Sequence, residues 1–309
     1  MTRPLLSLVV LGFRNFEVTT KACLESLRPW FGDIDIEILV VDNGSSDGSA
    51  EKTADWCVKH PSIQCLLSDS NRGFAGGMNW GVSHARGQWI LLVNNDTVFP
   101  EYTLDALMRV IRQAPDNVAM LGPVTNAAGN GQRLWKPDAT PADWLQIGQW
   151  LNTNPTHHLI PAYRCDFFCI AIRQDVWLEL EGLDPVFGLG YYEDFDFSLR
   201  LRKAGYEQMI TEDVFVLHVG SATFQGSKEA RKLIKVNKKL LLKKHPNTKF
   251  EHTRIGNLSV MMAYKKMRDD GVWSSELSFR QDLRSSALTE DGPRSILKRF
   301  IWSKKIKNL

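Results

Sequence analysis

A short polar run follows an apolar segment of the sequence. Residues 89–93 are apolar and flanked by turn signals, which indicates a buried central strand. Asn94, Asn95 and Asp96 follow this segment directly. Polar side chains at the carboxyl end of such a strand face the crevice in which open α/β sheets bind ligands, and a carboxylate there can hold a divalent cation. The alternative is a polar turn whose side chains satisfy local backbone groups.

A second predicted strand also ends at an acidic residue. It covers residues 36–41, and Asp42 follows it. The turn that begins there continues from Asn43 to Asp47 and is rich in residues that cap helices. An acid at the end of such a strand accepts hydrogen bonds from a nucleobase or a ribose. We therefore expect Asp42 and the polar run after residue 93 to face one crevice.

A glycine-rich loop lies between a predicted strand at residues 63–67 and a predicted helix at residues 78–85. It contains Gly73, Gly76 and Gly77. Glycine lets the backbone approach a ligand closely, and the N-terminus of the following helix favours anions. A plain turn with positive φ angles is the alternative. Because the spacing is not GxGxxG, a nicotinamide-dinucleotide site is poorly supported.

Two adjacent acids, Glu193 and Asp194, stand at the start of another predicted helix. One interpretation is that they only complement the helix dipole. Neighbouring carboxylates also disfavour full ionisation of both, and this raises the pKa of one of them towards that of a useful general base.

Strands and helices alternate along the chain around these residues. Such alternation predicts an α/β fold with a mostly parallel sheet and helices on both faces. The stretch from residue 125 to 161 contains three tryptophans and several prolines, and no element is assigned to it. The predicted strands cover residues 5–11, 36–41, 63–67, 89–93, 118–124, 167–173 and 214–217. The predicted helices cover residues 15–30, 50–59, 78–85, 102–113 and 174–180, and a further helix ends at Lys203.

The C-terminal part is basic. A predicted helix after Gly226 combines lysines and arginines with leucines, and residues 294–309 carry basic and apolar side chains but no acid. A basic amphipathic segment with aromatic residues is typical of a helix that lies on an anionic membrane. A solvated helix packed on the domain is the alternative. We expect residues 226–309 to form a basic helical extension of a domain that spans residues 1–225, with a donor half near 1–100 and an acceptor half near 101–225.

Composition places the protein in an ordinary soluble class. The chain has 309 residues, a formal net charge of +3 and 43% hydrophobic residues, which allows one large α/β domain or two small ones. The number of cysteines is odd, at 5, and no CxxC pair occurs, which favours a reducing compartment. No apolar run is long enough to span a bilayer. We expect a cytoplasmic protein, peripheral on the inner face of the cell membrane, and no nucleic-acid partner.

Taken in order, the motifs resemble those of inverting GT-A glycosyltransferases of the large family 2 type, and especially the rhamnosyltransferase-like branch. The resemblance covers roughly residues 5–225 and rests on the motifs at residues 40–47, 71–79, 94–96 and 193–196. It implies a Rossmann-like GT-A domain that moves a sugar from a nucleotide-diphosphate sugar to a glycan or polyprenyl-linked glycan acceptor in bacterial surface polysaccharide synthesis. It also implies a divalent cation, Mn²⁺ or Mg²⁺.

The resemblance also implies roles for individual residues at the donor site. Asp42 matches the acid that binds the base or ribose, and Asp47 matches the second acid of that turn. Asn71, Gly73 and Asn79 match the donor-contacting loop. The full expected donor-binding set is Asp42, Asn43, Asp47, Asn71, Gly73, Gly77, Asn79, Asn94, Asn95 and Asp96.

The expected metal site departs from the family pattern. Residues 94–96 occupy the place of the family's DxD motif, and because its first position is an amide, only Asp96 supplies a carboxylate there. His218 stands where related enzymes recruit a third ligand, although a lone histidine after a strand is ordinarily a satisfied surface or core residue. An imidazole suits Mn²⁺ better than Mg²⁺. The expected metal ligands are Asp96 and His218.

By the same resemblance, Asp194 is the expected general base and Glu193 binds or orients the acceptor. Acceptor contacts are expected from residues 126–132 and from the tryptophan-rich stretch that ends at Trp150. Two other classes stay open at this point. One is a nucleotidyltransferase, which also uses a nucleotide-binding α/β sheet. The other is a non-catalytic binder of nucleotide sugars or anionic polymers, which the amide at Asn94 makes plausible.

Overall fold

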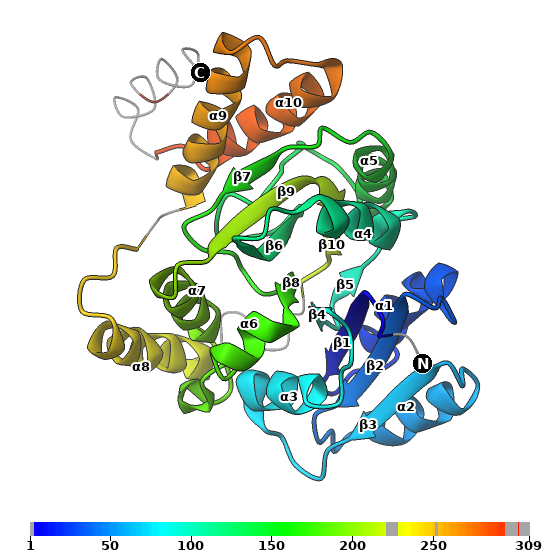
Figure 1. The fold of residues 1–309 in the computed structure, drawn as a ribbon. Coiled ribbons are helices and arrows are strands. Elements are labelled where there is room, and N and C mark those ends of the chain that lie inside the picture. Colours follow the sequence, from blue (N-terminus) through cyan, green and yellow to red (C-terminus); the bar gives the residue numbers. More distant parts are fainter. Residues whose placement is uncertain (1–2, 221–227, 251–252, 294–301, 303–309) are drawn as a thin grey trace.

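The structure is a computed structural model that describes residues 3–220, 228–250, 253–293 and 302 (Figure 1). Within these residues the main sheet has eight strands in the order β3-β2-β1-β4-β8-β6-β9-β7. β8 runs antiparallel to β4 and β6, β7 runs antiparallel to β9, and the other neighbours are parallel. The strands are β1 (Leu6–Gly12), β2 (Ile36–Asp42), β3 (Ile63–Leu67), β4 (Trp89–Asn94), β6 (Val118–Val124), β7 (Leu159–Pro161), β8 (Cys169–Arg173) and β9 (Glu207–Phe215). The predicted mostly parallel sheet is confirmed.

Helices cover both faces of this sheet because its central strands are apolar on both sides. In β1, Leu8 and Val10 pack into a core with α1, α2 and α4, whereas Val9 and Leu11 pack into a second core with α3 and α7. The helices are α1 (Thr20–Ser26), α2 (Ser49–Val58), α3 (Gly73–Val82), α4 (Thr103–Gln113), α5 (Pro141–Thr153), α6 (Gln174–Glu179), α7 (Glu193–Lys203), α8 (Lys228–Lys244), α9 (Thr253–Asp269) and α10 (Ser275–Glu290).

A small second sheet joins two distant parts of the chain. β5 (Thr97–Val98) pairs antiparallel with β10 (Leu217–His218), so that His218 lies opposite Thr97. The backbone N–H of Val219 also donates to the carbonyl oxygen of Asp96 at 2.9 Å. This pairing brings the segment after β9 to the end of β4.

Three local predictions differ from the structure. The helix predicted over residues 15–30 is limited to α1 and a 3₁₀ turn at Arg28–Trp30, because Asn15 has a positive φ of 54° and forms a turn first. The strand predicted over residues 214–217 is divided, since its first residues end β9 and Leu217 starts β10. The helix expected to follow the glycine loop starts within it, at Gly73, whose N–H donates to Asn71 Oδ1 at 2.8 Å.

Residues 125–161, to which the sequence pattern assigns no element, contain α5. Thr140 and Asp143 form a capping box at its start, with Pro141 in the first turn. The apolar side of α5, including Trp144 and Leu151, is buried in the core. Trp144 therefore packs inside the protein, stacked on Phe215 with ring centroids 5.7 Å apart.

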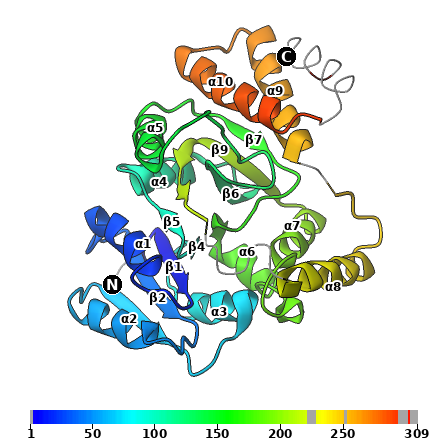
Figure 2. The same ribbon diagram turned by 180° about the vertical axis from the view of Figure 1, so that it is seen from behind.

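Helices α9 and α10 pack on the same domain, beside β7 and α5 (Figures 1 and 2). The expected boundary near residue 225 lies outside the described residues, as does the basic tail at 294–309 apart from Trp302. None of the helices in the described segments has the length and apolarity that a membrane crossing requires.

A buried ion pair fastens α10 to the sheet. Arg284 on α10 and Glu212 on β9 both have side chains that are 0% exposed, and Arg284 Nε donates to Glu212 Oε1 at 3.1 Å. Arg280, one turn earlier, donates to the carbonyl oxygens of Glu212 at 3.0 Å and Asn154 at 2.9 Å. Because desolvated charges are stable only when paired, this contact makes α10 part of the folded domain.

Replacing one partner of this pair should destabilise the whole domain. Arg284→Met leaves the Glu212 carboxylate buried without its partner, and the free energy of unfolding should fall by roughly 3 to 5 kcal/mol. Lys265→Ala removes an exposed pair with Asp269 on α9 and should cost at most about 1 kcal/mol. Urea denaturation of both variants measures the difference. Equal stability of the Arg284→Met variant and the wild type would contradict the assignment.

Candidate active site

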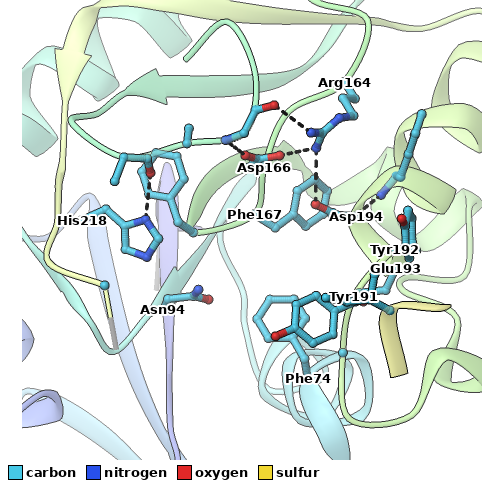
Figure 3. Close-up of a pocket in the computed structure, with 18 of the residues that line it drawn as sticks. Phe74, Asn94, Arg164, Asp166, Phe167, Tyr191, Tyr192, Glu193, Asp194 and His218 are labelled. Carbon is cyan, nitrogen blue, oxygen red and sulfur yellow. Dashed lines mark hydrogen bonds and ion pairs between the residues drawn. The ribbon is translucent and has the colours of Figure 1, made fainter. Parts of the chain in front are cut away.

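A cavity of about 1250 Å³ opens where β4, β10 and the start of α7 meet (Figure 3). Asn94 from the end of β4 and His218 from β10 lie on one side of it, and Glu193 and Asp194 from α7 lie on the other. Aromatic side chains fill much of the remaining wall: Phe74, Trp135, Phe167, Phe168, Tyr191, Tyr192, Phe195 and Phe250. The cavity therefore joins two groups of residues that the sequence predicts to act together.

The three polar residues after β4 have different surroundings. Asn94 lines the cavity. Asn95 points elsewhere, since its Nδ2 donates to the hydroxyls of Thr19 at 3.0 Å and Thr20 at 2.9 Å and so ties the turn to α1. Asp96 Oδ2 lies 3.4 Å from His218 Nε2.

His218 is held in one orientation. Its Nδ1 lies 3.0 Å from the carbonyl oxygen of Ala127, and its ring stacks on Phe168 at 5.3 Å between centroids. A ring nitrogen that donates to a carbonyl leaves the other nitrogen, here Nε2, with a lone pair in the neutral ring. Burial lowers the pKa of His218, but the Asp96 carboxylate and the Ala127 carbonyl outweigh burial and raise this pKa above its ordinary value.

Asp96 and His218 fit the expected cation site as a pair of ligands. A carboxylate oxygen and an imidazole nitrogen form a donor set that suits Mn²⁺. Within the part of the chain that the structure describes, no group of three or more His, Cys, Asp and Glu side chains is placed to hold a metal ion. The described residues thus offer Asp96 and His218 as two candidate ligands, and the remaining positions would fall to substrate oxygens and water.

Glu193 and Asp194 begin α7 after an unusual backbone segment. Tyr191 and Tyr192 both have positive φ angles, of 72° and 78°, which non-glycine residues adopt only when neighbouring contacts hold them. Asn237 on α8 supplies such contacts, because its Nδ2 lies 2.8 Å from the Gly190 carbonyl oxygen and 3.1 Å from that of Tyr191.

The two acids are in a low-dielectric environment that favours their neutral forms. Burial and then the neighbouring Asp194 raise the pKa of Glu193 to about 8. Glu193 is 6% exposed, and its Oε2 has no hydrogen-bond partner among the described residues. Burial also raises the pKa of Asp194 to about 6, against the lowering effect of Arg164. At neutral pH this pair therefore holds about one proton.

Arg164 and Asp166 complete this part of the site and were not identified from the sequence. Arg164 Nη1 forms an ion pair with Asp166 and lies 4.0 Å from Asp194 Oδ2, as Figure 3 shows. Arg164 Nη2 donates to the Gly129 carbonyl oxygen at 3.1 Å. An R-x-D spacing just before β8 was the available signal, but it lies in a stretch with no clear periodicity.

Asp42, Asn43 and Asp47 do not line this cavity. Asp42 is 2% exposed and accepts hydrogen bonds from the N–H and hydroxyl of Ser45 at 2.8 and 2.6 Å. Asn43 Nδ2 donates to the Gly73 carbonyl oxygen at 3.0 Å, and Asp47 Oδ2 accepts from the Asn15 N–H at 2.9 Å. These side chains order the loops at the ends of β1 and β2.

The glycine loop and Asn79 join the two halves of the domain. A Cβ atom at Gly73 would collide with the Gly188 carbonyl oxygen, and one at Gly77 would lie 2.8 Å from Leu11 Cδ1. Asn79 Nδ2 donates to the Leu183 carbonyl oxygen at 2.7 Å, and the Leu183 N–H donates to Asn79 Oδ1 at 2.9 Å. Of the expected donor-binding set, the described lining of the cavity includes Asn94 alone. Donor contacts by the others stay predictions.

Comparison with known proteins identifies the family. The family model described as glycosyl transferase family 2 matches residues 8–177. The putative glycosyltransferase EpsH of Bacillus subtilis is 32% identical over 163 residues, which are 52% of this chain and 43% of that protein. An N-acetylglucosaminyl-diphospho-decaprenol L-rhamnosyltransferase of Mycobacterium tuberculosis is 22% identical over 211 residues, which are 59% of this chain and 66% of that protein.

The matched regions cover less than half of several of the curated relatives. The succinoglycan biosynthesis protein ExoO of Rhizobium meliloti, for example, is 33% identical over 112 residues, which are 36% of this chain and 30% of that protein.

Solved structures agree on the fold. The mannosyltransferase PcManGT from Pyrobaculum calidifontis, in complex with GDP-Man and Mn²⁺, superposes with a TM-score of 0.56 at 16% identity, covering 99% of this chain and 81% of that one. TarS from S. aureus superposes with a TM-score of 0.53 at 14% identity, covering 98% and 88%. The sheet order, the cavity and these likenesses agree with the expected GT-A fold, and the chain belongs to glycosyl transferase family 2.

Proposed function

We propose that this protein transfers a sugar, with inversion, from a nucleotide-diphosphate sugar to a hydroxyl of a glycan or lipid-linked glycan acceptor. The observation that carries the proposal is the single cavity with Asn94 and His218 on one side and Glu193 and Asp194 on the other. Relatives support the substrate class, since the mannosyltransferase structure contains GDP-Man and a relative is named as a rhamnosyltransferase. Membership of family 2 favours this activity over nucleotidyl transfer.

In this proposal, Asp194 removes the proton from the acceptor hydroxyl as its oxygen attacks the anomeric carbon. The bond from that carbon to the diphosphate breaks as the new glycosidic bond forms, and a single displacement inverts the configuration. Arg164 holds Asp194 in its ionised form, and the buried, largely protonated Glu193 binds the acceptor as a hydrogen-bond donor. Aromatic side chains line the wall around the reacting groups.

Asp96 and His218 would hold the divalent cation, Mn²⁺ or Mg²⁺. A bound cation supplies charge neutralisation at a leaving diphosphate. Asn94 adds a neutral amide to the same wall, where the family pattern has an acid. The other expected donor ligands, from Asp42 to Asn79, are proposed to act on the nucleotide from the loops that they order.

Two residues of the cavity wall are candidates for contact with the acceptor sugar. Trp135 and Arg133 line the cavity, and Arg133 Cζ lies 4.8 Å from the centroid of the Trp135 ring. Arg133 is paired with Asp291, and Trp135 offers an aromatic surface to an acceptor sugar. We place the enzyme in surface polysaccharide synthesis, in the cytoplasm and on the inner face of the cell membrane. A relative named for succinoglycan biosynthesis supports the pathway class.

Asp194→Asn should remove the base and leave donor binding nearly intact. Loss of a general base costs roughly 100- to 10,000-fold in rate, so turnover with a metal and a nucleotide-sugar panel should fall by that factor. Calorimetric titration of nucleoside diphosphate checks binding. Asp55→Asn on the exposed side of α2 is the matched control and should keep full activity. Near-normal turnover in the Asp194→Asn variant would contradict the assignment.

The dependence of kcat/KM on pH should reflect ionisation of the Asp194 carboxylate, whose pKa the neighbouring Arg164 lowers. Asp194 acts as a base only when ionised, so kcat/KM should fall as the pH drops through its pKa of about 6. Arg164→Gln removes the cation that lowers this pKa, and the acidic limb should move to higher pH by roughly one to three units.

Arg112→Gln is the control for this profile, because Arg112 pairs with Asp35 at the exposed surface. Its acidic limb should stay where it is in the wild type. An unmoved limb in the Arg164→Gln variant would contradict the role given to Arg164.

Mn²⁺ binding should depend on both expected ligands. Loss of a group that only orients a metal ligand costs about 10- to 100-fold in metal affinity, so loss of a ligand itself, in Asp96→Ala or His218→Ala, should weaken Mn²⁺-dependent nucleotide binding by at least roughly tenfold. Electron paramagnetic resonance of free Mn²⁺ measures this without turnover. His84→Ala, at an exposed position just after α3, is the control. Unchanged Mn²⁺ affinity in both variants would exclude the site.

A further inference from the structure

Helix α8 carries a continuous row of exposed lysines. They recur with the spacing i, i+4, i+7, i+11 and i+15, which places them on one side of a helix with 3.6 residues per turn. None of them forms an ion pair with another described residue. This lysine row consists of Lys228, Lys232, Lys235, Lys239 and Lys243.

The opposite side of α8 is fixed to the candidate active site. Ala230, Asn237 and Leu241 are buried there, at 2%, 3% and 0% exposure. Asn237 Nδ2 donates to the Phe187 carbonyl oxygen at 2.7 Å, in addition to its bonds to the segment that precedes Glu193. The helix therefore cannot turn its lysine row without disturbing the start of α7.

The end of α8 is fastened as well. Lys244 Nζ lies 2.6 Å from carboxylate oxygens of both Asp184 and Asp196, and His245 Nε2 lies 2.9 Å from Asp196. Asp196 itself is 0% exposed and belongs to the first turn of α7. These contacts use the last lysine of the helix and leave the lysine row facing outward.

A third side of α8 forms part of the cavity wall. Leu233, Ile234 and Lys238 line the cavity, and Lys238 Nζ lies 4.3 Å above the ring of Phe250, which also lines it. In both ribbon views α8 lies at the edge of the molecule beside α7 (Figures 1 and 2). The lysine row is therefore next to the cavity but outside it.

We propose that the lysine row of α8 docks the protein on an anionic phospholipid bilayer, with the cavity facing the lipid headgroups. The inference rests on the proposed function and deepens it, because it makes the acceptor a lipid-anchored glycan. Five lysines in a straight row match a flat anionic surface over about 20 Å. A sugar on a lipid anchor is confined near the headgroups, and a helix that forms both the cavity wall and the docking surface brings the two together.

The residues beside the row favour a bilayer over a nucleic acid. Val236 and Leu242 flank it at 53% and 36% exposure, and aliphatic side chains of this kind enter the headgroup region. Single-stranded nucleic acids are held by aromatic side chains between cations, and the exposed side of α8 has none. Glu229 is the one acid on the helix.

The test is co-sedimentation of the full chain with vesicles of phosphatidylglycerol and phosphatidylcholine, and with vesicles of phosphatidylcholine alone. The wild type should bind only the anionic vesicles, and salt should weaken binding. Each lysine near an anionic bilayer contributes about fivefold, so the triple variant Lys232→Gln, Lys235→Gln, Lys239→Gln should bind roughly 100-fold more weakly.

A charge-matched control removes three exposed lysines from other surfaces. The triple variant Lys59→Gln, Lys136→Gln, Lys266→Gln has the same net charge as the α8 variant and should bind like the wild type. Equal binding by the α8 variant and the wild type, or an equal loss in the control, would overturn the proposal. Tighter retention of the wild type on single-stranded RNA than on anionic vesicles, lost in the α8 variant, would also overturn it.

Hydrolysis of a nucleotide sugar without vesicles separates this inference from the proposed function. The three replaced lysines lie outside the cavity lining, so the α8 variant should hydrolyse the donor at the wild-type rate. Absent hydrolysis in the wild type would count against the proposed function and leave the vesicle result unaffected. A slower rate in the α8 variant alone would contradict a purely docking role.

Discussion

A two-residue antiparallel pairing between β5 and β10 holds the site together. It sets His218 opposite Thr97, and the Val219 N–H bonds the Asp96 carbonyl, so a carboxylate and an imidazole from distant segments meet at 3.4 Å. The Ala127 carbonyl then fixes the ring. Without this pairing, the turn after β4 would hold one carboxylate, which is a poor cation site alone. The cavity wall next to Asn94 follows from the same pairing.

On the other side of the cavity, burial raises the pKa values of two carboxyl groups. Glu193 is buried and Asp194 is partly buried at the start of α7, and Arg164 and Asp166 add one charge of each sign beside them. The strained backbone at Tyr191 and Tyr192 is held by Asn237, so α8 supports the geometry of the acids while its outer row of lysines faces away. Asn237 thus connects the helix that carries the proposed docking surface to the segment that precedes the proposed catalytic group.

The features that could be predicted from the sequence are those that depend on neighbouring residues in the chain. Apolar runs located the strands, and their polar ends located residues 94–96. The acids at 193 and 194 were predicted at the start of a helix, where α7 does begin. Contacts between residues far apart in the chain have no local sequence pattern, so they could not be predicted in this way. Asn79 bonds Leu183, and Arg164 lies beside Asp194, through folding of the whole domain. Asp42, expected in the cavity, is instead satisfied by Ser45, an interaction that its helix-capping turn favours.

We propose that a sugar nucleotide's diphosphate binds between Asp96 with His218 on one side of the cavity and Asp194 on the other. A crystal structure of the full chain with Mn²⁺ and the nucleoside diphosphate that binds most tightly tests it most directly. We expect Mn²⁺ to be held by Asp96 and His218 together with the diphosphate, and the terminal phosphate to face Asp194 across the cavity. A diphosphate bound outside this cavity, or Mn²⁺ on other residues, would contradict it.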